Sequence, residues 1–364
     1  MLLKEFVSVL AGIAPFSLQE SYDNSGIQVG SPQQNVEKGL VCLDLTPDVV
    51  QEAINKECDL IVCHHPLIFT GVKSITGKNT TEAIIIEAIK NDIAIVAIHT
   101  NLDKTHYGVN HELGERLGLQ DMRILQAETG LLKKLVTFCP TAQAEQVRAA
   151  LFEAGAGVIG NYDCCSFNSE GKGSFRAGDG SNPFTGALNE LHYEPEVRIE
   201  TIFPAYLQAA VLKALIDSHP YEEVAYDIYP LENVFDKVGS GMIGNLEAPM
   251  PAKDFLAQVK KQLNVPFLRH SAISHAEITN VAICGGSGSF LLHQAINAGA
   301  QAFVTADIKY HQFFDAENKI LLVDAGHYET EQYTKNLLHR MVKKKMPKFA
   351  LLISEANTNP VNYY

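Results

Sequence analysis

The feature that most constrains the fold is a regular alternation of short apolar runs with helical patterns near both ends of the chain. Strand-like apolar runs occupy 39–45, 59–65, 93–99, 280–286, 302–307 and 320–327. Helical patterns separate them at 47–56, 81–91 and 289–298. Strands that are apolar throughout are typical of parallel sheets covered by helices on both faces. The sequence therefore predicts an α/β fold with mainly parallel sheets.

The two stretches of alternation resemble each other. Residues 49–65 (VVQEAINKECDLIVCHH) align without a gap on residues 291–307 (LLHQAINAGAQAFVTAD), and His65 falls opposite Asp307. Two generic helix–strand units can match in this way by chance. We predict instead a duplicated α/β domain, in which strands of each half end at one sheet edge. Such edges are where parallel sheets collect ligands.

The segment between the halves has a different character. Its pattern is strand, helix, strand, strand, helix, strand, which resembles a ferredoxin-like α+β unit. The third element is expected as a strand at 162–171, and the glycine-rich stretch 171–186 is too rich in turn formers for a core element. We therefore predict a main domain made of residues 1–130 and 233–364, interrupted by an inserted domain at 131–232.

Composition excludes several classes of partner. Lys and Arg number 29 against 42 Asp and Glu, a formal charge of −13, which argues against nucleic acid as the main partner. No apolar run approaches the roughly 20 residues that a membrane span needs. Residues 1–16 are amphipathic and predict a first helix, not a signal peptide. The odd number of cysteines, 7, indicates reduced thiols. We predict a cytoplasmic protein.

Three clusters of ligand-type side chains follow apolar strands. They are His64 with His65, His99 with Asp103, and His327 with Glu331. His327 and Glu331 are four residues apart, so both face the same way if a helix begins there. Imidazoles and carboxylates without cysteine suit divalent Zn, Mn, Fe, Co or Ni. A carboxylate can bridge two ions, so five ligands, His64, His65, Asp103, His327 and Glu331, are enough to hold two ions per chain.

Other polar residues near these clusters have assigned or open roles. His99 is predicted to orient Asp103 or a histidine. Glu329 is only two residues from His327 and would point away on a helix, so Glu331 is preferred. The sequence CGGSG (284–288) could cradle a phosphate, but it lacks the full spacing of a nucleotide-binding loop and could equally be a tight turn.

The overlay of the two halves also predicts a position for Asp307. It places this carboxylate at the metal site, at the sheet-edge position that His65 occupies in the first half. Asp307, Lys309 and His311 could then act as acid, base or charge clamp in catalysis. The alternative for Asp307 is a helix N-cap or a surface salt bridge.

Five motifs in this order resemble a known family. They are SYDNSGIQVG (21–30), CHHPLIF (63–69), HTNLD (99–103), TADIKYH (305–311) and DAGHYETE (324–331). They resemble those of dinuclear metal centre hexameric proteins, also called GTP cyclohydrolase I type 2 homologues or Ngg-interacting-factor-three-like proteins. The resemblance implies the same five metal ligands and a toroidal homohexamer, a trimer of dimers, with metal sites facing its interior. PFTG and HPYEEVAYDIYPL resemble a PII- or CutA-like insert.

Two functions are compatible with these residues. The first is a metal-dependent hydrolase of the cyclohydrolase or phosphoesterase type, which acts on a nucleotide or phosphorylated small molecule through a metal-bound water. No guanine-reading motif is visible, so the family's name alone does not identify the substrate. The alternative is a non-catalytic hexameric scaffold that regulates a partner or handles metal.

Overall fold

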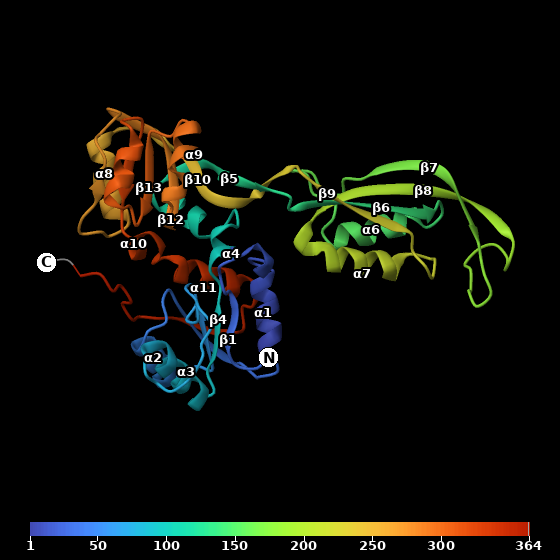
Figure 1. Ribbon diagram of the computed structural model, residues 1–364, viewed down its shortest axis with the longest axis horizontal. Helices are drawn as coiled ribbons and strands as arrows, with labels where there is room; N and C mark the ends of the chain where they lie inside the picture. The colour runs from blue at the N-terminus through green and yellow to red at the C-terminus, as the bar shows by residue number, and fades with distance from the viewer. Residues whose placement is uncertain (363) are drawn as a thin grey trace. The chain divides into compact units, whose positions relative to one another are not determined.

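The protein, described here by a computed structural model covering residues 1–362 and 364, forms two compact units. The main unit comprises residues 1–127 and 236–364, and the inserted unit comprises residues 128–235. The sequence places the inserted domain at 131–232, within the range of this second unit. Figure 1 colours the chain by residue number, so the main unit carries both the blue and the red ends.

The first sheet of the main unit is mainly parallel and buried on both faces. Its order is β1 (Gly26–Val29), β4 (Ala94–Ala97), β3 (Leu60–Cys63), β2 (Lys38–Cys42) and β15 (Ala350–Ile353), with only β1 antiparallel. Alternate side chains enter two cores. Val41 and Val62 pack with α1 (Leu3–Ala11) and α11 (Thr334–Lys345), whereas Leu40 and Ile61 pack with α2 (Pro47–Asn55) and α3 (Thr80–Lys90).

The second sheet of the main unit has a parallel centre with antiparallel flanks. Its order is β11 (Arg269–His270), β14 (Leu321–Asp324), β13 (Ala302–Ala306), β12 (Glu277–Ser287), β10 (Val234–Pro251) and β5 (Leu119–Thr129). Strands β12, β13 and β14 are parallel. Helices α5 (Val109–Arg116) and α8 (Ala252–Gln262) cover one face. The turns η3 (Ser289–Leu291) and η4 (Tyr310–Ala316) and helix α9 (Leu292–Asn297) cover the other.

The predicted α/β fold with a duplicated helix–strand unit is confirmed. In the first half α2 leads into β3, and in the second half η3 and α9 lead into β13, each strand lying inside a parallel region. Asp307 follows β13 directly, and His65 is the second residue after β3. Three short elements complete the main unit: η1 (Phe16–Leu18), α4 (Thr100–Asp103) and α10 (His327–Glu331).

The inserted unit has the ferredoxin-like order of elements that the sequence predicts. Along the chain it runs β6 (Leu132–Pro140), α6 (Ala144–Glu153), β7 (Phe167–Arg176), β8 (Leu191–Pro204), η2 (Ala205–Leu207), α7 (Gln208–Ser218) and β9 (Tyr226–Leu231). The sheet order is β7-β8-β6-β9, and neighbouring strands run antiparallel. The core lies between the sheet and the two helices, where Leu135, Ile199 and Leu215 are buried.

One sequence expectation within this unit is wrong. The third element is not a strand at 162–171, because β7 spans Phe167–Arg176 and runs into the glycine-rich stretch. Cys164 has φ of 53°, in the left-handed region, so an extended strand cannot run through this residue. The glycines are tolerated because β7 is an edge strand that pairs only with β8. Gly173 also leaves space that the Glu196 side chain occupies.

No helix in the described part of the chain is long and apolar enough to cross a bilayer. The seven cysteines are free thiols, and Cys63, which precedes the paired histidines, is fully buried in the first sheet.

The main unit is expected to fold without the inserted unit. Strands β5 and β10, which lead out of and back into the main unit, are neighbours in one sheet. Gly239 lies so close to Gln126 that an added Cβ would collide with its carbonyl oxygen. Replacing residues 128–235 by a short Gly/Ser linker should therefore give a folded protein with unchanged metal content. Thermal melting and elemental analysis test this, and a soluble but metal-free variant would contradict it.

Candidate metal centre

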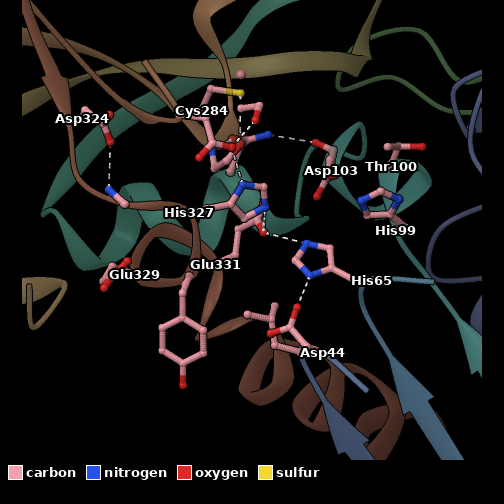
Figure 2. A pocket seen from close by; sticks show the side chains of 18 of the residues that line it. Asp44, His65, His99, Thr100, Asp103, Cys284, Asp324, His327, Glu329 and Glu331 are labelled. Carbon is pink, nitrogen blue, oxygen red and sulfur yellow. Dashed lines mark hydrogen bonds and ion pairs between the residues drawn. The ribbon is translucent and has the colours of Figure 1, made fainter. Parts of the chain in front are cut away.

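Elements from both sheets of the main unit bring the candidate ligands together. His64 and His65 follow β3, Asp103 ends α4 after β4, and α10 carries His327 and Glu331 after β14. His65 Nε2 lies 3.0 Å from Glu331 Oε2, although the two residues are 266 apart in the sequence. Figure 2 shows His65 between Asp44 and Glu331. The predicted convergence of the two halves at one place is therefore present in the fold.

The four histidines of this cluster share one hydrogen-bonding pattern, because an oxygen acceptor lies at Nδ1 of each ring. The pairs are His64 with Ile98 O at 2.8 Å, His65 with Asp44 at 2.7 Å, His99 with Asp23 at 2.8 Å, and His327 with Asp307 at 2.7 Å. A carbonyl or carboxylate accepts, so each Nδ1 carries a hydrogen. The other nitrogen, Nε2, is thereby left to face the cluster as a metal ligand would.

Three overlapping groups of side chains are spaced to hold metal ions. They are His64, His65 and His99; His65, His327 and Glu331; and His64, Asp103 and Glu331, with the ligand atoms of each group within 4.8 Å of one another. His64, His65 and Glu331 each belong to two of the groups and so connect them. Histidine nitrogens and carboxylate oxygens in such numbers suit a divalent transition metal.

Two buried polar atoms in this cluster lack a hydrogen-bond partner among the described residues. They are Nε2 of His64, whose side chain is fully buried, and Oδ1 of Asp103. The two atoms lie 3.5 Å apart. The Asp103 side chain is 28% exposed, but Oδ1 itself is shielded from solvent. Leaving such atoms unpaired costs about 1–3 kcal/mol each. A cation between them would satisfy both, so the residues fit a metal ion.

Protonation of the remaining ligands follows from their neighbours. Burial alone would lower the pKa of His65, but hydrogen bonds to Asp44 and Glu331 raise it to about 10. His327 is likewise raised, despite burial, to a pKa of about 11 by Asp307 and Glu331. The Glu331 pKa is held well below its usual range by both histidines, against the effect of burial. In the metal-free protein, the two protonated imidazoles therefore carry positive charge at the place where a metal ion would bind.

The other two ligands show the opposite shifts. Burial lowers the pKa of His64 to about 3, and the nearby His65 adds to this effect. Burial raises the pKa of Asp103 well above its usual range, and the nearby Glu331 carboxylate adds to it. His64 is therefore neutral with a free lone pair at Nε2, which is the state that binds a metal.

The loop 284–288 lies directly against a candidate ligand. Gly286 has φ of 58°, and a Cβ at this position would collide with Oε1 of Glu331. Gly286 N donates to Thr330 Oγ1 at 3.0 Å, in the same helix as Glu331. The tight turn therefore has a structural use here, since it lets the backbone approach the metal cluster.

Replacing Gly286 by alanine is expected to weaken metal binding. The new Cβ displaces the Glu331 carboxylate, so affinity should fall about 10- to 100-fold, the range seen when support of a ligand is lost. Gly299→Ala is the matched control, because Gly299 has φ of 79° but nothing within 4 Å of an added Cβ. Both variants share a backbone strain of about 1–3 kcal/mol. Chelator competition measures affinity, and equal affinities would contradict the expected contact.

The predicted residues differ in where the structure places them. Asp307 is at the cluster, as the overlay predicts: its carboxylate accepts hydrogen bonds from His327 Nδ1 and from the Ser287 hydroxyl. Lys309 and His311 are exposed and are not among the described residues that line the cavity. Glu329 lines the cavity but pairs with Asn359, at 3.0 Å.

His99 has a different position from the one predicted. The sequence assigns it to orienting Asp103 or another histidine, whereas the structure groups it with His64 and His65 as a possible ligand. Its own orientation comes from Asp23, whose carboxylate also contacts Thr100. Asp23 and Asp44 were not assigned roles from the sequence. Their signal was weak: Asp23 falls inside the motif SYDNSGIQVG, and Asp44 follows the apolar strand β2.

The cluster opens into a cavity of about 810 Å³ in the main unit. Aromatic side chains line it, including Tyr22 and Phe69, whose ring centroids are 6.3 Å apart. Lys104 and Arg269, which line it, are both ion-paired: Lys104 with Glu20 at 2.9 Å, and Arg269 with Asp324. A cavity of this size is in the range of small-molecule sites. Its positive charge for an anionic ligand would come mainly from bound metal.

Fold and site together define an α/β protein with a histidine–carboxylate cluster spaced for metal ions. Residues 1–360 match the family described as Duf34/NIF3 (NGG1p interacting factor 3). The chain belongs to this family. It is 40% identical to a Bacillus subtilis protein named GTP cyclohydrolase 1 type 2 homolog, over 99% of this chain and 98% of that protein.

Solved structures agree with this assignment. A Bacillus cereus protein related to NIF3 is 39% identical, covers 100% of this chain and 99% of its own, and has a TM-score of 0.88. A Staphylococcus aureus protein is 32% identical with the same coverage and a TM-score of 0.78. The resemblance drawn from the five motifs is therefore confirmed.

Proposed function

We propose that the protein is a metal-dependent hydrolase that acts on a nucleotide or another phosphorylated small molecule. The observation that carries the proposal is the pair of unpartnered atoms, His64 Nε2 and Asp103 Oδ1, beside a cluster of correctly oriented histidines at the base of a cavity. His64, His65, Asp103, His327 and Glu331 would hold two divalent ions, with His99 as a further ligand to one of them. When bound, such ions polarise a phosphoryl oxygen and lower the pKa of water.

The residues of this chain would position the reactants. Asp44, Asp23 and Asp307 fix the rings of His65, His99 and His327, each through a hydrogen bond at Nδ1. The aromatic rings of Tyr22 and Phe69 offer apolar surface for a base or another flat group. Because Lys104 and Arg269 are already paired with carboxylates, a phosphate would bind chiefly at the metal cluster.

The experiment is a turnover screen with the full-length protein loaded with Mn²⁺ or Zn²⁺. Nucleoside mono-, di- and triphosphates, sugar phosphates and p-nitrophenyl phosphate are incubated with it, and products are separated by chromatography and mass spectrometry. Hydrolysis of at least one compound is expected, and both EDTA and Asp103→Asn should remove it. Turnover equal to that of metal-free protein across the panel would contradict the proposal and favour the scaffold alternative.

Asp307→Asn is expected to lower turnover more than metal content. The amide keeps the size of the side chain but weakens the hydrogen bond that orients His327, so the rate should fall about 10- to 100-fold. Glu317→Gln is the matched control, since this exposed carboxylate lies in the same half of the chain and pairs with Lys319. Steady-state kinetics at fixed metal occupancy measure the effect. An unchanged rate would remove Asp307 from the proposed site.

The family resemblance adds an assembly to this proposal, a homohexamer with the metal sites facing its interior. Sedimentation velocity of the full-length protein tests it. A mass near six times 39.9 kDa supports the hexamer, and a monomer at micromolar concentration contradicts it.

A further inference from the structure

The inserted unit contains a second cavity, of about 610 Å³, that shares no residue with the metal centre. It lies on the sheet face turned away from α6 and α7. Ile199 packs with the helices, so the alternation along β8 turns Glu196 and Arg198 to the other face. Gly171 and Gly173 of β7 lie beside Glu196 there, and a Cβ at Gly173 would collide with its carboxylate.

Two loops form the walls of this cavity. The loop between β7 and β8 contributes Phe184, and the loop before β9 contributes Tyr221 and Glu222. They are joined by a hydrogen bond from Asn182 N to Glu222 Oε1, at 2.8 Å. Phe184 belongs to the sequence PFTG, and Tyr221 and Glu222 belong to HPYEE; neither sequence takes part in the metal site.

A buried carboxylate points into this cavity without a cationic partner. Glu196 is 9% exposed, and its Oε1 accepts a hydrogen bond from the Tyr221 hydroxyl at 2.9 Å. Burial raises the pKa of Tyr221, and the bond to Glu196 raises it further, so the phenol stays a donor. No Lys, Arg or His nitrogen among the described residues forms an ion pair with Glu196. Oε2 has no hydrogen bond from these residues either.

The cations that line the cavity are directed elsewhere. Lys172 lies over the Tyr193 ring at 4.7 Å. Because side chains alternate along β7, Arg176 is on the same face of the strand as Lys172, opposite the face that meets Glu196. Arg198 pairs with Glu200 at 2.9 Å. The interior around Glu196 is therefore acidic and lacks a counter-ion of its own.

Aromatic rings flank the same space. The Tyr221 ring centroid lies 5.9 Å from that of Phe175 and 6.3 Å from that of Phe184. Aromatic faces attract cations, and a carboxylate forms its strongest hydrogen bonds with charged N–H donors. We propose that this cavity binds a small organic cation carrying an ammonium or guanidinium group, with Glu196 accepting its N–H and the three rings contacting its stem.

Ligand-observed NMR with the full-length protein tests the proposal. Agmatine and butylamine are the cationic probes, choline is a cation without an N–H donor on nitrogen, and 1-butanol is neutral. Saturable binding of agmatine or butylamine is expected, with choline at least about tenfold weaker, because it lacks the N–H that a charge-assisted bond requires. No binding of the neutral probe is expected. If neither agmatine nor butylamine binds saturably at concentrations up to about 10 mM, the proposal is overturned.

Variants separate this cavity from general attraction to an acidic protein. Glu196→Gln keeps the shape of the side chain and should weaken binding at least about tenfold, since it removes the charged acceptor. Glu153→Gln makes the same change of net charge at an exposed position on α6 and should leave binding unchanged. Phe175→Leu keeps an apolar side chain without the ring and should give a smaller loss. Equal affinity of Glu196→Gln and wild type overturns the proposal, as does equal weakening by Glu153→Gln.

Discussion

Glu331→Gln is expected to reduce metal affinity by more than about a hundredfold, beyond the range for losing a supporting contact. Glu331 Oε2 lies 3.0 Å from His65 Nε2 and 3.1 Å from His327 Nε2, and this carboxylate belongs to two of the three ligand groups. The amide has the same size but no charge to offset a divalent ion. Competition with a chromophoric chelator and elemental analysis of dialysed protein measure the change.

Glu329→Gln is the control for this variant. Glu329 lies on the same short helix and is buried to a similar degree, 4% exposed against 5% for Glu331, but it bonds Asn359. Its replacement should leave metal content unchanged. Thermal melting in chelator checks that both variants fold, because removing a buried charge that faces two protonated histidines also lowers stability. Wild-type metal content in Glu331→Gln would show that the ligand assignment is wrong.

The sequence predicts the fold well because the signals that define it are local. Runs such as 60–63 and 94–97 are apolar at every position, which is typical of a strand covered on both faces. Asp307 could be placed for the same reason: when the two helix–strand units are aligned, the residues that follow their strands correspond to each other. The spacing of His327 and Glu331 likewise needs only the period of a helix.

What the sequence does not predict depends on contacts between distant segments. Asp23 reaches His99 across 76 residues, and Thr358 supports Asp44 across 314, so neither role has a local pattern. Lys309 and His311 follow Asp307 in the sequence, but both are exposed, Lys309 just before the 3-10 helix η4 and His311 within it. The sequence places strand β7 at 162–171 instead of Phe167–Arg176 because pairing with β8, not propensity, decides where it begins and ends.

Metal affinity is expected to rise steeply with pH between about 7 and 9. In the metal-free protein the pKa of His65 is raised to about 10 and that of His327 to about 11, so both imidazoles are protonated throughout this range. A metal ion needs Nε2 of each ring unprotonated and must displace both protons. Because protons compete with the metal, affinity increases as pH rises, by up to about tenfold per pH unit for each proton displaced. The raised pKa of Asp103 adds to the effect in the same direction.

Chelator competition at fixed ionic strength, from pH 6.5 to 9, measures the slope, and a pH indicator in weakly buffered protein counts the protons released. His65→Gln is the matched variant: it removes one competing proton together with one ligand, so its affinity is lower and its slope should fall by about one decade per pH unit. His339→Gln changes a histidine that contacts the Leu351 carbonyl and belongs to none of the three ligand groups, so it should keep the wild-type slope. Affinity that stays constant over this range, with no proton release, would mean that the metal does not bind at Nε2 of His65 and His327. The hydrogen bonds of these two rings to Glu331 would then belong to a structural ion-pair network and not to a metal site.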